Sequence, residues 1–523
     1  MIESTKRSPN MPTVLIVGAG PTGLTLACEL ARRGISPRLI EAEPGPRPGS
    51  RGKGIQPRSL EVFDDLGIVD RVVAKGRMAM PIRSTALDGR VTLSNATTFE
   101  NRPDIPYPAS LITPEWRIEE ALRLRLAELG GEVEFGTTLE GFEQSDEAVS
   151  AVIRQDGKLE TITAHWLIGC DGGHSVVRKQ AGIAFAGQTR EEVRMIVADL
   201  VVEGLDRDAW HMWRHEEGLV SLCPLPSTDV FQYQAMIEPG QDAELDLANM
   251  QAILNRRSGR TDVRLHEPTW KSLWRANIRL VDRYRRGRVF LAGDAAHIHS
   301  PAGGQGMNTG IQDAHNLGWK LAAVVRGGSA ALLDSYEAER RPVAAGVLAL
   351  SNARLEQTIA QKGLVTRGDA NTMQLTISYR DSALARDDRD ERAPLRAGDR
   401  APDATGLHTV DGAHRLFDLT RGGRFTLLSF GDRSEVETRF DLRTFHVVEE
   451  PTGPGEITDT EGHLAAAYGA GDHTFVLIRP DGYIALISDS GDAQVVSDYL
   501  AAIDGRAETY SSTSGTASGV AGV

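Results

Sequence analysis

The chain has 523 residues, enough to bury several hydrophobic cores, and 41% of them are hydrophobic, as in ordinary globular proteins. The formal net charge of −14 argues against nucleic acid as a partner, because phosphate backbones attract basic surfaces. The three cysteines form no CxxC pair, which excludes a zinc ribbon and a dithiol redox centre and favours a reducing cytoplasm.

The first predicted element is a strand that runs into a glycine-rich turn and a helix, in TVLIVGAGPTGLTLACELARRG (Thr13 to Gly34). The three glycines of its GxGxxG pattern have separate tasks. Gly18 permits a tight turn, Gly20 lets the backbone approach a pyrophosphate, and Gly23 lets the helix pack closely on the strand. Because the first N–H groups of the helix are free to bind an anion, this stretch predicts a dinucleotide site.

A second predicted strand, Arg38-Leu39-Ile40, ends at Glu41, 23 residues after Gly18. A carboxylate at that strand end accepts hydrogen bonds from the ribose hydroxyls of an adenosine and repels a 2′-phosphate, which argues against NADP at this site. Up to this point the sequence leaves both FAD and NAD open as the dinucleotide.

Two features follow in the middle of the chain. The stretch from Ala164 to Ile183 again combines an apolar strand with an Asp-Gly turn, at Asp171. From about Gly182 to Trp274, short alternating runs such as VRMIVADLVVE and VFQYQAMIE predict the strands of an antiparallel sheet. We expect this sheet to supply most of a substrate pocket.

The stretch GDAAHIHSPAGGQGMNTGIQDA (Gly293 to Ala314) decides between the two dinucleotides. A buried strand ends at Asp294, and a second glycine-rich loop leads into a helix. NAD does not need this second loop, whereas FAD continues from its pyrophosphate into a ribitol chain and an isoalloxazine ring. Asp294 could bind a ribitol hydroxyl, and the helix-start N–H groups could face the ring where negative charge gathers on reduction. We therefore predict FAD.

The same stretch contains two histidines, His297 and His299, in an HxH pattern that could suggest a metal site. With no third ligand in view, we predict no metal, and we expect both rings to line a pocket or to stabilise the fold. His174, after Asp171, is interpreted in the same way.

The last third of the chain is predicted to be helical first and then rich in strands. A helical pattern from Leu332 to Gly363 is interrupted at Pro342, and the charged segment from Arg380 to Pro402 suits a linker. Beyond it, RFTLLSFGD and HTFVLIRPDGYIALISD are strand patterns.

The GxGxxG, DG and GD stretches resemble the motifs of the single-component (group A) FAD-dependent aromatic hydroxylases. SRGKGIQPRSLEVFDDLGI (Ser50 to Ile68) also resembles that family's segment after the second strand, in which an arginine, here Arg51, contacts the FAD. The likeness covers nearly the whole chain and is closest to actinobacterial hydroxylases of polyketide-derived aromatic rings and to phenol and phenylpropionate hydroxylases. One position departs from the pattern, because Glu115 stands where the family usually has glutamine, and a carboxylate accepts but does not donate hydrogen bonds.

The resemblance implies an α/β fold with a Rossmann-like FAD-binding domain of the glutathione-reductase type, an antiparallel-sheet substrate domain and a C-terminal thioredoxin-like domain. The expected boundaries are 12–75, 109–182 and 275–350 for the FAD-binding domain, 76–108 and 183–274 for the substrate domain, 351–392 for a helical linker, 393–505 for the thioredoxin-like domain, and 506–523 for a disordered tail. The thioredoxin-like part contains no cysteine, so we expect it to serve packing or oligomer contacts and not redox chemistry.

The predicted site residues come from these motifs and from the resemblance. The predicted cofactor-binding residues are Gly18, Gly20, Pro21, Thr22, Gly23, Glu41, Ala42, Arg51, Gln56, Arg117, Leu139, Asp171, Gly293, Asp294, Gly304, Gly306, Met307 and Asn308. Pro301 resembles the family's proline beside the reactive C4a carbon of the flavin and is the predicted catalytic residue. Trp213 and Tyr233 are the predicted substrate contacts.

The resemblance implies an FAD-dependent monooxygenase of antibiotic biosynthesis that hydroxylates an electron-rich, phenolic aromatic of the polycyclic polyketide type. NADPH or NADH would be a transient co-substrate with O2, and the oxygen would pass through a flavin C4a-hydroperoxide. Two alternatives stay open, a Baeyer–Villiger or epoxidising oxygenase of a polyketide and a non-catalytic FAD-binding module. A second copy of the chain is a further candidate partner. No early apolar run is long enough for export or for a membrane, so we expect no membrane partner and a cytoplasmic location.

Overall fold

The computed structural model describes residues 13–94, 102–238, 240, 243–299, 304–361, 371–389, 393–431, 433 and 435–505. The chain divides into two compact units. Unit 1 comprises residues 1–102, 107–318 and 340–376, and unit 2 comprises residues 103–106, 319–339 and 377–523. The sequence motifs for cofactor binding all fall in unit 1. The domain boundaries expected from the sequence stay predictions.

A five-stranded sheet at the centre of unit 1 joins four of the predicted strands in parallel. Its order is β18-β19-β11-β1-β2, and only the edge pair of β18 with β19 is antiparallel. The strands are β1 (Val14–Val17), β2 (Arg38–Ile40), β11 (Trp166–Gly169), β18 (Arg285–Arg286) and β19 (Val289–Leu291). Their continuous apolar runs are buried, as expected for a parallel sheet that helices cover. This is the Rossmann-like arrangement that the sequence predicts.

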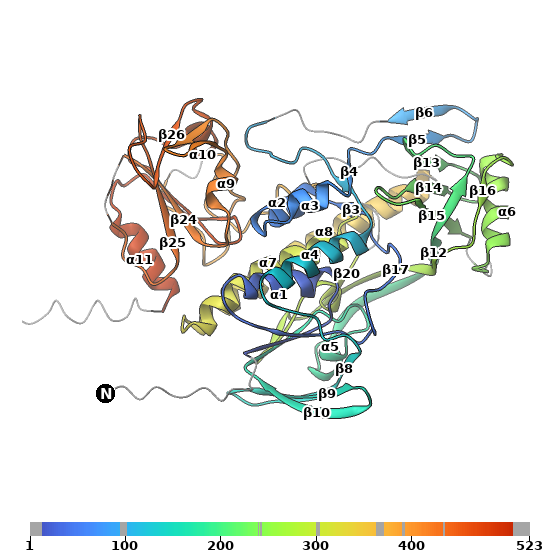
Figure 1. The fold of residues 1–523 in the computed structure, drawn as a ribbon, viewed down its shortest axis with the longest axis horizontal. Helices are drawn as coiled ribbons and strands as arrows, with labels where there is room; N and C mark the ends of the chain where they lie inside the picture. The colour runs from blue at the N-terminus through green and yellow to red at the C-terminus, as the bar shows by residue number, and fades with distance from the viewer. Residues whose placement is uncertain are drawn as a thin grey trace, which may run out of the picture. The chain divides into compact units, whose positions relative to one another are not determined.

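Helices pack around this sheet, and Figure 1 shows α1 beside α4. The thiol of Cys28 on α1 donates to the backbone carbonyl of Leu122 on α4 over 3.4 Å, so the two helices are in direct contact. The helices of this part are α1 (Pro21–Ala31), α2 (Pro57–Asp65), α3 (Val69–Val73), α4 (Glu115–Glu128), α5 (Val176–Gln180), α7 (Gly306–Val325) and α8 (Asp334–Gln361).

Residues 82–94 and 185–298 build a nine-stranded, mostly antiparallel sheet in unit 1. Its order is β20-β17-β12-β15-β14-β13-β5-β6, with β16 paired to β12. The strands are β5 (Ile82–Thr85), β6 (Val91–Ser94), β12 (Phe185–Glu203), β13 (Trp210–Trp213), β14 (Val220–Pro224), β15 (Val230–Ile237), β16 (Arg264–Leu265), β17 (Trp270–Val281) and β20 (His297–Ile298). The expected antiparallel sheet is therefore present, and we call it the substrate sheet.

The sequence interpretation of residues 182–274 as strands alone is wrong in one place. Helix α6 (Leu247–Ser258) lies against the substrate sheet, at its outer side in Figure 1. The Asp246 side chain caps it by accepting from the Asn249 N–H over 2.7 Å, and Gly259 ends it in the left-handed conformation. These two signals were present in the sequence, but the polar helix between them has a weak apolar pattern.

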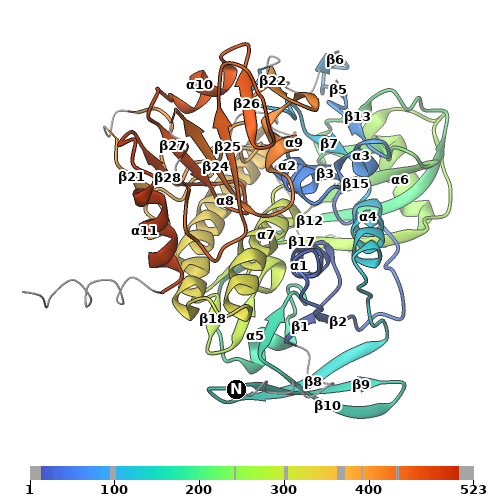
Figure 2. The ribbon, with the colours of Figure 1, turned by 60° about the vertical axis from the view of Figure 1, so that its left-hand side comes forward.

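Two small three-stranded sheets complete unit 1. One contains β8 (Thr137–Gln144), β9 (Val149–Gln155) and β10 (Lys158–Ala164), and Figure 2 shows it below α5. The other joins β3 (Gly54–Ile55) and β4 (Arg77–Met78) to the two sides of β7 (Leu111–Ile112).

Unit 2 contains an eight-stranded sheet of order β21-β28-β27-β24-β25-β26-β22-β23. At its centre β24 is parallel to β25 and antiparallel to β27, which in turn is antiparallel to β28, and a helix follows, as in thioredoxin-like folds. The strands are β21 (Arg386–Asp387), β22 (Leu407–Thr409), β23 (Gly412–His414), β24 (Phe425–Phe430), β25 (Leu442–Val447), β26 (Glu456–Asp459), β27 (Phe475–Ile478) and β28 (Ile484–Ser488). Helices α9 (Leu416–Thr420) and α10 (His463–Tyr468) cover one face, and α11 (Gln494–Ile503) covers the other (Figure 2).

Helix α8 corrects one expectation. It runs without interruption through Pro342, because a proline removes one helical hydrogen bond while the flanking turns keep theirs. Its end at Gln361 lies within the helical pattern that the sequence predicts from Leu332 to Gly363. Across the described part of the chain, no helix has the length and apolar character needed to cross a membrane. The expected tail at 506–523 lies outside the described residues.

Candidate active site

The carboxyl ends of four parallel strands bring the predicted motifs together. Val17 pairs with Ile40 and with Gly169, and Gly169 pairs with Leu291, so the four strands end in register. The residues that follow these ends are Gly18, Glu41, Asp171 and Gly293 with Asp294. In open α/β sheets ligands bind outside the carboxyl ends of the strands, and this edge is therefore the candidate site.

The three glycines of the first loop differ in the space around them. A Cβ atom at Gly18 would lie 2.4 Å from the carbonyl oxygen of Cys170, and Gly18 has a φ of 101°. A Cβ atom at Gly23 would lie 1.9 Å from the carbonyl oxygen of Gly18, whereas at Gly20 it would meet nothing within 4 Å. Gly18 and Gly23 thus allow a tight turn and close packing, and Gly20 leaves its side of the turn open for a ligand.

The first loop and the late loop touch each other through Thr22. Its Oγ1 lies 2.5 Å from the place of a Cβ atom at Gly293 and 2.4 Å from the place of one at Gly310 on α7. Gly293 also has a φ of 62°. The two glycine-rich loops, some 270 residues apart in the chain, are therefore adjacent walls of one site.

Glu41 is held at its strand end by the backbone of the same edge. Its Oε2 accepts from the Ala19 N–H over 2.8 Å, and its Oε1 accepts from the Glu43 N–H and from Arg47, each over 3.1 Å. A carboxylate has about four acceptor positions, so room remains for one more donor, such as a ribose hydroxyl.

Arg51 and Asp294 lie close enough to Glu115 for their charges to affect its pKa. Asp294 is exposed to solvent, but the protein around its carboxyl group desolvates it and raises its pKa. The charges of His297 and Arg51 oppose this rise. Burial and the nearby Glu119 carboxylate raise the pKa of Glu115 to about 7, against the charge of Arg51. Glu115 Oε2 accepts from the Gly52 N–H over 2.7 Å, beside the exposed Arg51. Solvent-accessible charges within the protein are typical of the wall of a binding site.

The late loop meets the start of α2 through Asn308. Its Oδ1 accepts from the Gln56 N–H over 2.8 Å, and its Nδ2 donates to the carbonyl oxygens of Gly54 and Gly304, over 2.9 and 2.8 Å. Asn308 therefore holds the loops in place, and its side chain is used within the protein. A Cβ atom at Gly304 would meet only the Gln56 side chain, at 3.8 Å, which leaves space along this loop.

The other predicted cofactor contacts differ in their elements, their burial and their partners. Asp171 caps α5, since its carboxylate accepts from the Ser175 hydroxyl and from two backbone N–H groups. Arg117 on α4 pairs with Glu120 over 2.8 Å, and Leu139 is buried in β8. Ala42 is exposed after β2, and Met307 is half-buried at the start of α7. Pro301 lies in residues 300–303, outside the described residues.

Trp213 and Tyr233 are not placed with the other site residues. Both are buried in the core between the substrate sheet and α6, and the Tyr233 hydroxyl donates to the carbonyl oxygen of Met250 on that helix over 3.3 Å. Because side chains alternate along a strand, their neighbours of the opposite parity face the other side of the sheet. Gln232, next to Tyr233, is one of these.

The segment that carries Arg51 packs on the opposite face of the substrate sheet. The sequence predicts Arg51 as a cofactor contact but does not predict this packing. Gln232 accepts from the Lys53 ammonium and donates to the Ser50 carbonyl, and Asp199 accepts from the Ser50 N–H over 2.7 Å. All of these side chains are buried. Polar residues inside otherwise apolar strands, as in FQYQ, were the available signal.

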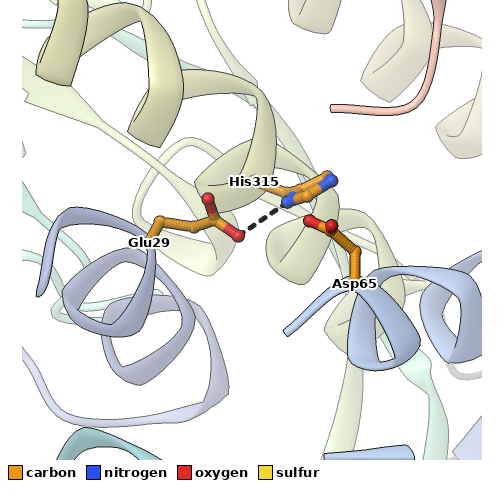
Figure 3. A group of neighbouring side chains, drawn as sticks. All are labelled: Glu29, Asp65 and His315. Atoms are coloured by element: carbon orange, nitrogen blue, oxygen red, sulfur yellow. Dashed lines mark hydrogen bonds and ion pairs between the residues drawn. The ribbon is translucent and has the colours of Figure 1, made fainter. Parts of the chain in front are cut away.

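A cluster of Glu29, Asp65 and His315, in which Asp65 is half-buried, joins α1, α2 and α7 (Figure 3). Glu29 accepts from the His315 ring over 2.8 Å, and Arg32 donates to both carboxylates. Burial opposes ionisation of Glu29, but Arg32, Arg33 and His315 outweigh it and hold its pKa well below the ordinary value. Since two guanidinium groups already balance these carboxylates, the cluster is an ion-pair network that connects the helices.

Replacing Glu115 by glutamine is expected to stabilise the FAD-free protein at pH 8 by about 1–2 kcal/mol. The unfolded chain ionises this carboxyl near its ordinary pKa of 4.5, whereas the folded chain holds the proton up to about pH 7. Between pH 4.5 and about pH 7, ionisation of Glu115 therefore lowers the free energy of unfolding increasingly. Because the side chain contacts solvent, this loss is smaller than the whole pKa difference would give.

Urea unfolding of wild type and Glu115→Gln at pH 5 and pH 8 checks this expectation. The difference should be small at pH 5 and present at pH 8. An equal difference at both pH values would show that Glu115 is ionised at pH 5 in the folded protein.

Comparisons with known proteins identify the family of the chain. Residues 11–351 match the family described as FAD binding domain, and residues 395–507 match the aromatic-ring hydroxylase C-terminal family. A flavin-dependent monooxygenase of Mycobacteroides abscessus is 44% identical, over 94% of this chain and 100% of that protein. The 6-methylpretetramide 4-monooxygenase of Streptomyces rimosus is 37% identical, over 91% of this chain and 90% of that protein. Aklavinone-11 hydroxylase, solved with FAD and aklavinone, matches with a TM-score of 0.81 at 26% identity, over 95% of this chain and 100% of that chain.

The chain belongs to the FAD-dependent aromatic-ring hydroxylases and is an FAD-dependent monooxygenase. FAD is its cofactor, and the residues present fit it. The open side of Gly20, the acceptor position left on Glu41 and the solvent-facing Asp294 lie along one edge of the sheet, as a long dinucleotide requires.

Proposed function

We propose that the protein hydroxylates a polycyclic aromatic substrate that carries a phenolic hydroxyl, with NADPH or NADH and O2 as co-substrates. The observation that carries this proposal is the meeting of the two glycine-rich loops at Thr22, beside Asp294 and the nearby charge of Arg51. The relatives support the substrate class, since one is named for 6-methylpretetramide and another was solved with aklavinone.

FAD, when bound, supplies the electron transfer and oxygen chemistry of the reaction. The residues of the chain bind and orient it. Gly20 at the start of α1 admits the pyrophosphate, and Asp294 accepts from a hydroxyl of the ribitol chain. Gln232 and Asp199 fix the segment of Arg51 against the substrate sheet, which keeps this cation near Asp294. The substrate sheet shields the reacting groups from water.

A panel of phenols and polycyclic quinones, supplied with NADPH or NADH under ¹⁸O₂, tests the proposal. We expect several phenols to stimulate NAD(P)H consumption, with one ¹⁸O atom in a hydroxylated product. A lactone or an epoxide as the product would favour the Baeyer–Villiger or epoxidising alternative. A yellow protein that consumes no NAD(P)H with any compound would favour a non-catalytic FAD-binding module.

We further propose a cytoplasmic location, which the three buried cysteines, none of them in a disulfide, support. We retain the sequence-predicted cofactor contacts in the two glycine-rich loops as proposals. We also propose that the substrate contacts the face of the substrate sheet opposite α6. A homodimer is a further proposal that sedimentation of the purified chain would check.

A further inference from the structure

Glu115, the first residue of α4, is held in place by two hydrogen bonds to Gly52. Its side-chain Oε2 accepts from the Gly52 N–H over 2.7 Å, and its own N–H donates to the Gly52 carbonyl oxygen over 3.1 Å. Its second side-chain oxygen, Oε1, has no hydrogen-bond partner among the described residues. The residue is half-buried, and Oε1 is not one of the fully enclosed polar atoms. One oxygen of a fixed carboxyl group is therefore available to another molecule.

The carboxyl group of Glu115 lies beside the start of α7. A Cβ atom at Gly52 would lie 3.4 Å from Glu115 Oε2 and 3.2 Å from Cε of Met307, in the first turn of α7. Asp294, which follows β19, is close enough for its charge to raise the pKa of Glu115. Because FAD has to extend from the first loop to this late loop, Glu115 lies next to the bound cofactor.

The charged groups around Glu115 come from three elements, namely Glu119 on α4, Arg51 beside Gly52 and Asp294 after β19. Burial and the two carboxylates favour the neutral form of Glu115, whereas Arg51 and the Gly52 N–H favour the ionised form. The balance gives Glu115 a pKa of about 7. Each of the two phosphates of FAD brings a further negative charge, so bound FAD shifts this balance towards the neutral form.

We propose that FAD binds to the form of the protein in which Glu115 carries a proton on Oε1, and that this O–H group donates to an acceptor oxygen of the cofactor. An ionised Glu115 can only accept, and it would repel the phosphates. Above about pH 7 the FAD-free protein has lost this proton, so binding of FAD takes a proton from solvent and places it on Oε1. The inference concerns the cofactor and does not depend on the proposed substrate.

Titration of the FAD-free protein with FAD, followed by flavin fluorescence from pH 6 to pH 8.5, measures this coupling. Below about pH 7 Glu115 is protonated with and without FAD, so the dissociation constant stays constant. At higher pH the FAD-free form alone loses the proton, and we expect the dissociation constant to rise about tenfold by pH 8.5. A dissociation constant that falls with rising pH would show that Glu115 binds FAD as a carboxylate, and it would overturn the inference.

Glu115→Gln assigns the pH dependence to this side chain, because glutamine keeps an acceptor for the Gly52 N–H and a donor for FAD but does not titrate. We expect its FAD affinity to be nearly independent of pH and about tenfold higher than that of the wild type at pH 8.5. Glu128→Gln, at the other end of α4, is the matched control, since Glu128 is 43% exposed and pairs with Arg71. It should keep the wild-type pH dependence. The same pH dependence in Glu115→Gln would contradict the role of Glu115.

Isothermal titration calorimetry of the wild type with FAD counts the protons directly, in two buffers of different ionisation enthalpy. We expect uptake of about one proton per FAD at pH 8 and almost none at pH 5.5. The wild type alone gives the sign of the exchange, so this test does not require a folded variant. Release of a proton at pH 8, or no exchange, would overturn the inference. Either result together with normal NADPH-driven hydroxylation would leave the proposed function intact.

Discussion

Replacing Gly20 by alanine is expected to weaken FAD binding at least about 100-fold, or roughly 2.7 kcal/mol, while the FAD-free protein keeps its stability. A Cβ atom at this position would meet nothing within 4 Å, and the backbone of Gly20, with a φ of −73°, is one that alanine adopts. The methyl group would instead occupy the space through which the backbone approaches a pyrophosphate. Flavin fluorescence of the titrated apoprotein measures the affinity.

Gly23→Ala is the matched control, three residues further along. Its Cβ atom would lie 1.9 Å from the backbone oxygen of Gly18, which cannot move without distorting the turn. We expect Gly23→Ala to lose about 2 kcal/mol or more of stability before any ligand is added. If Gly20→Ala binds FAD as tightly as the wild type, the pyrophosphate does not lie at this turn.

The second large effect is expected from Glu339→Ala in unit 2, with a loss of about 3–5 kcal/mol in the free energy of unfolding. Glu339 lies between Lys320 and Arg479, with N–O distances of 2.7 Å to each, and Arg479 also pairs with Asp481 over 2.6 Å. All four side chains are at most 1% exposed. Removing Glu339 would leave two buried cations with a single carboxylate.

Urea unfolding of the full chain measures this loss, with Arg380→Gln as the control. The Arg380–Asp399 pair also lies in unit 2, but the Arg380 side chain is 44% exposed, so we expect its loss to cost less than about 1 kcal/mol. Similar costs for Glu339→Ala and Arg380→Gln would contradict the view that burial determines the strength of these pairs.

The cofactor loops could be predicted from the sequence because their chemistry is local. A strand, a turn and a helix start follow one another within about 20 residues at Gly18 and again at Asp294, and parallel strands place such turns on one edge of the sheet. The register of the parallel strands is enough to bring the two loops together. The same locality explains why the strands of the C-terminal unit were recognised.

The substrate contacts could not be predicted in the same way. Which face of β15 carries Tyr233 depends on the helix that covers the sheet, and α6 was not recognised in the sequence. Alternation assigns Tyr233 and Gln232 to opposite faces but does not say which face is the core. The pair of Glu29 with His315 joins residues 286 positions apart, and no local pattern marks it.

A crystal structure of the chain with FAD tests the central claim most directly. We expect a single FAD whose pyrophosphate lies against the start of α1 at Gly20 and whose isoalloxazine ring lies beside the start of α7 at Gly306. A ring bound elsewhere, with the late loop empty, would contradict the account, as would a different dinucleotide at the first loop.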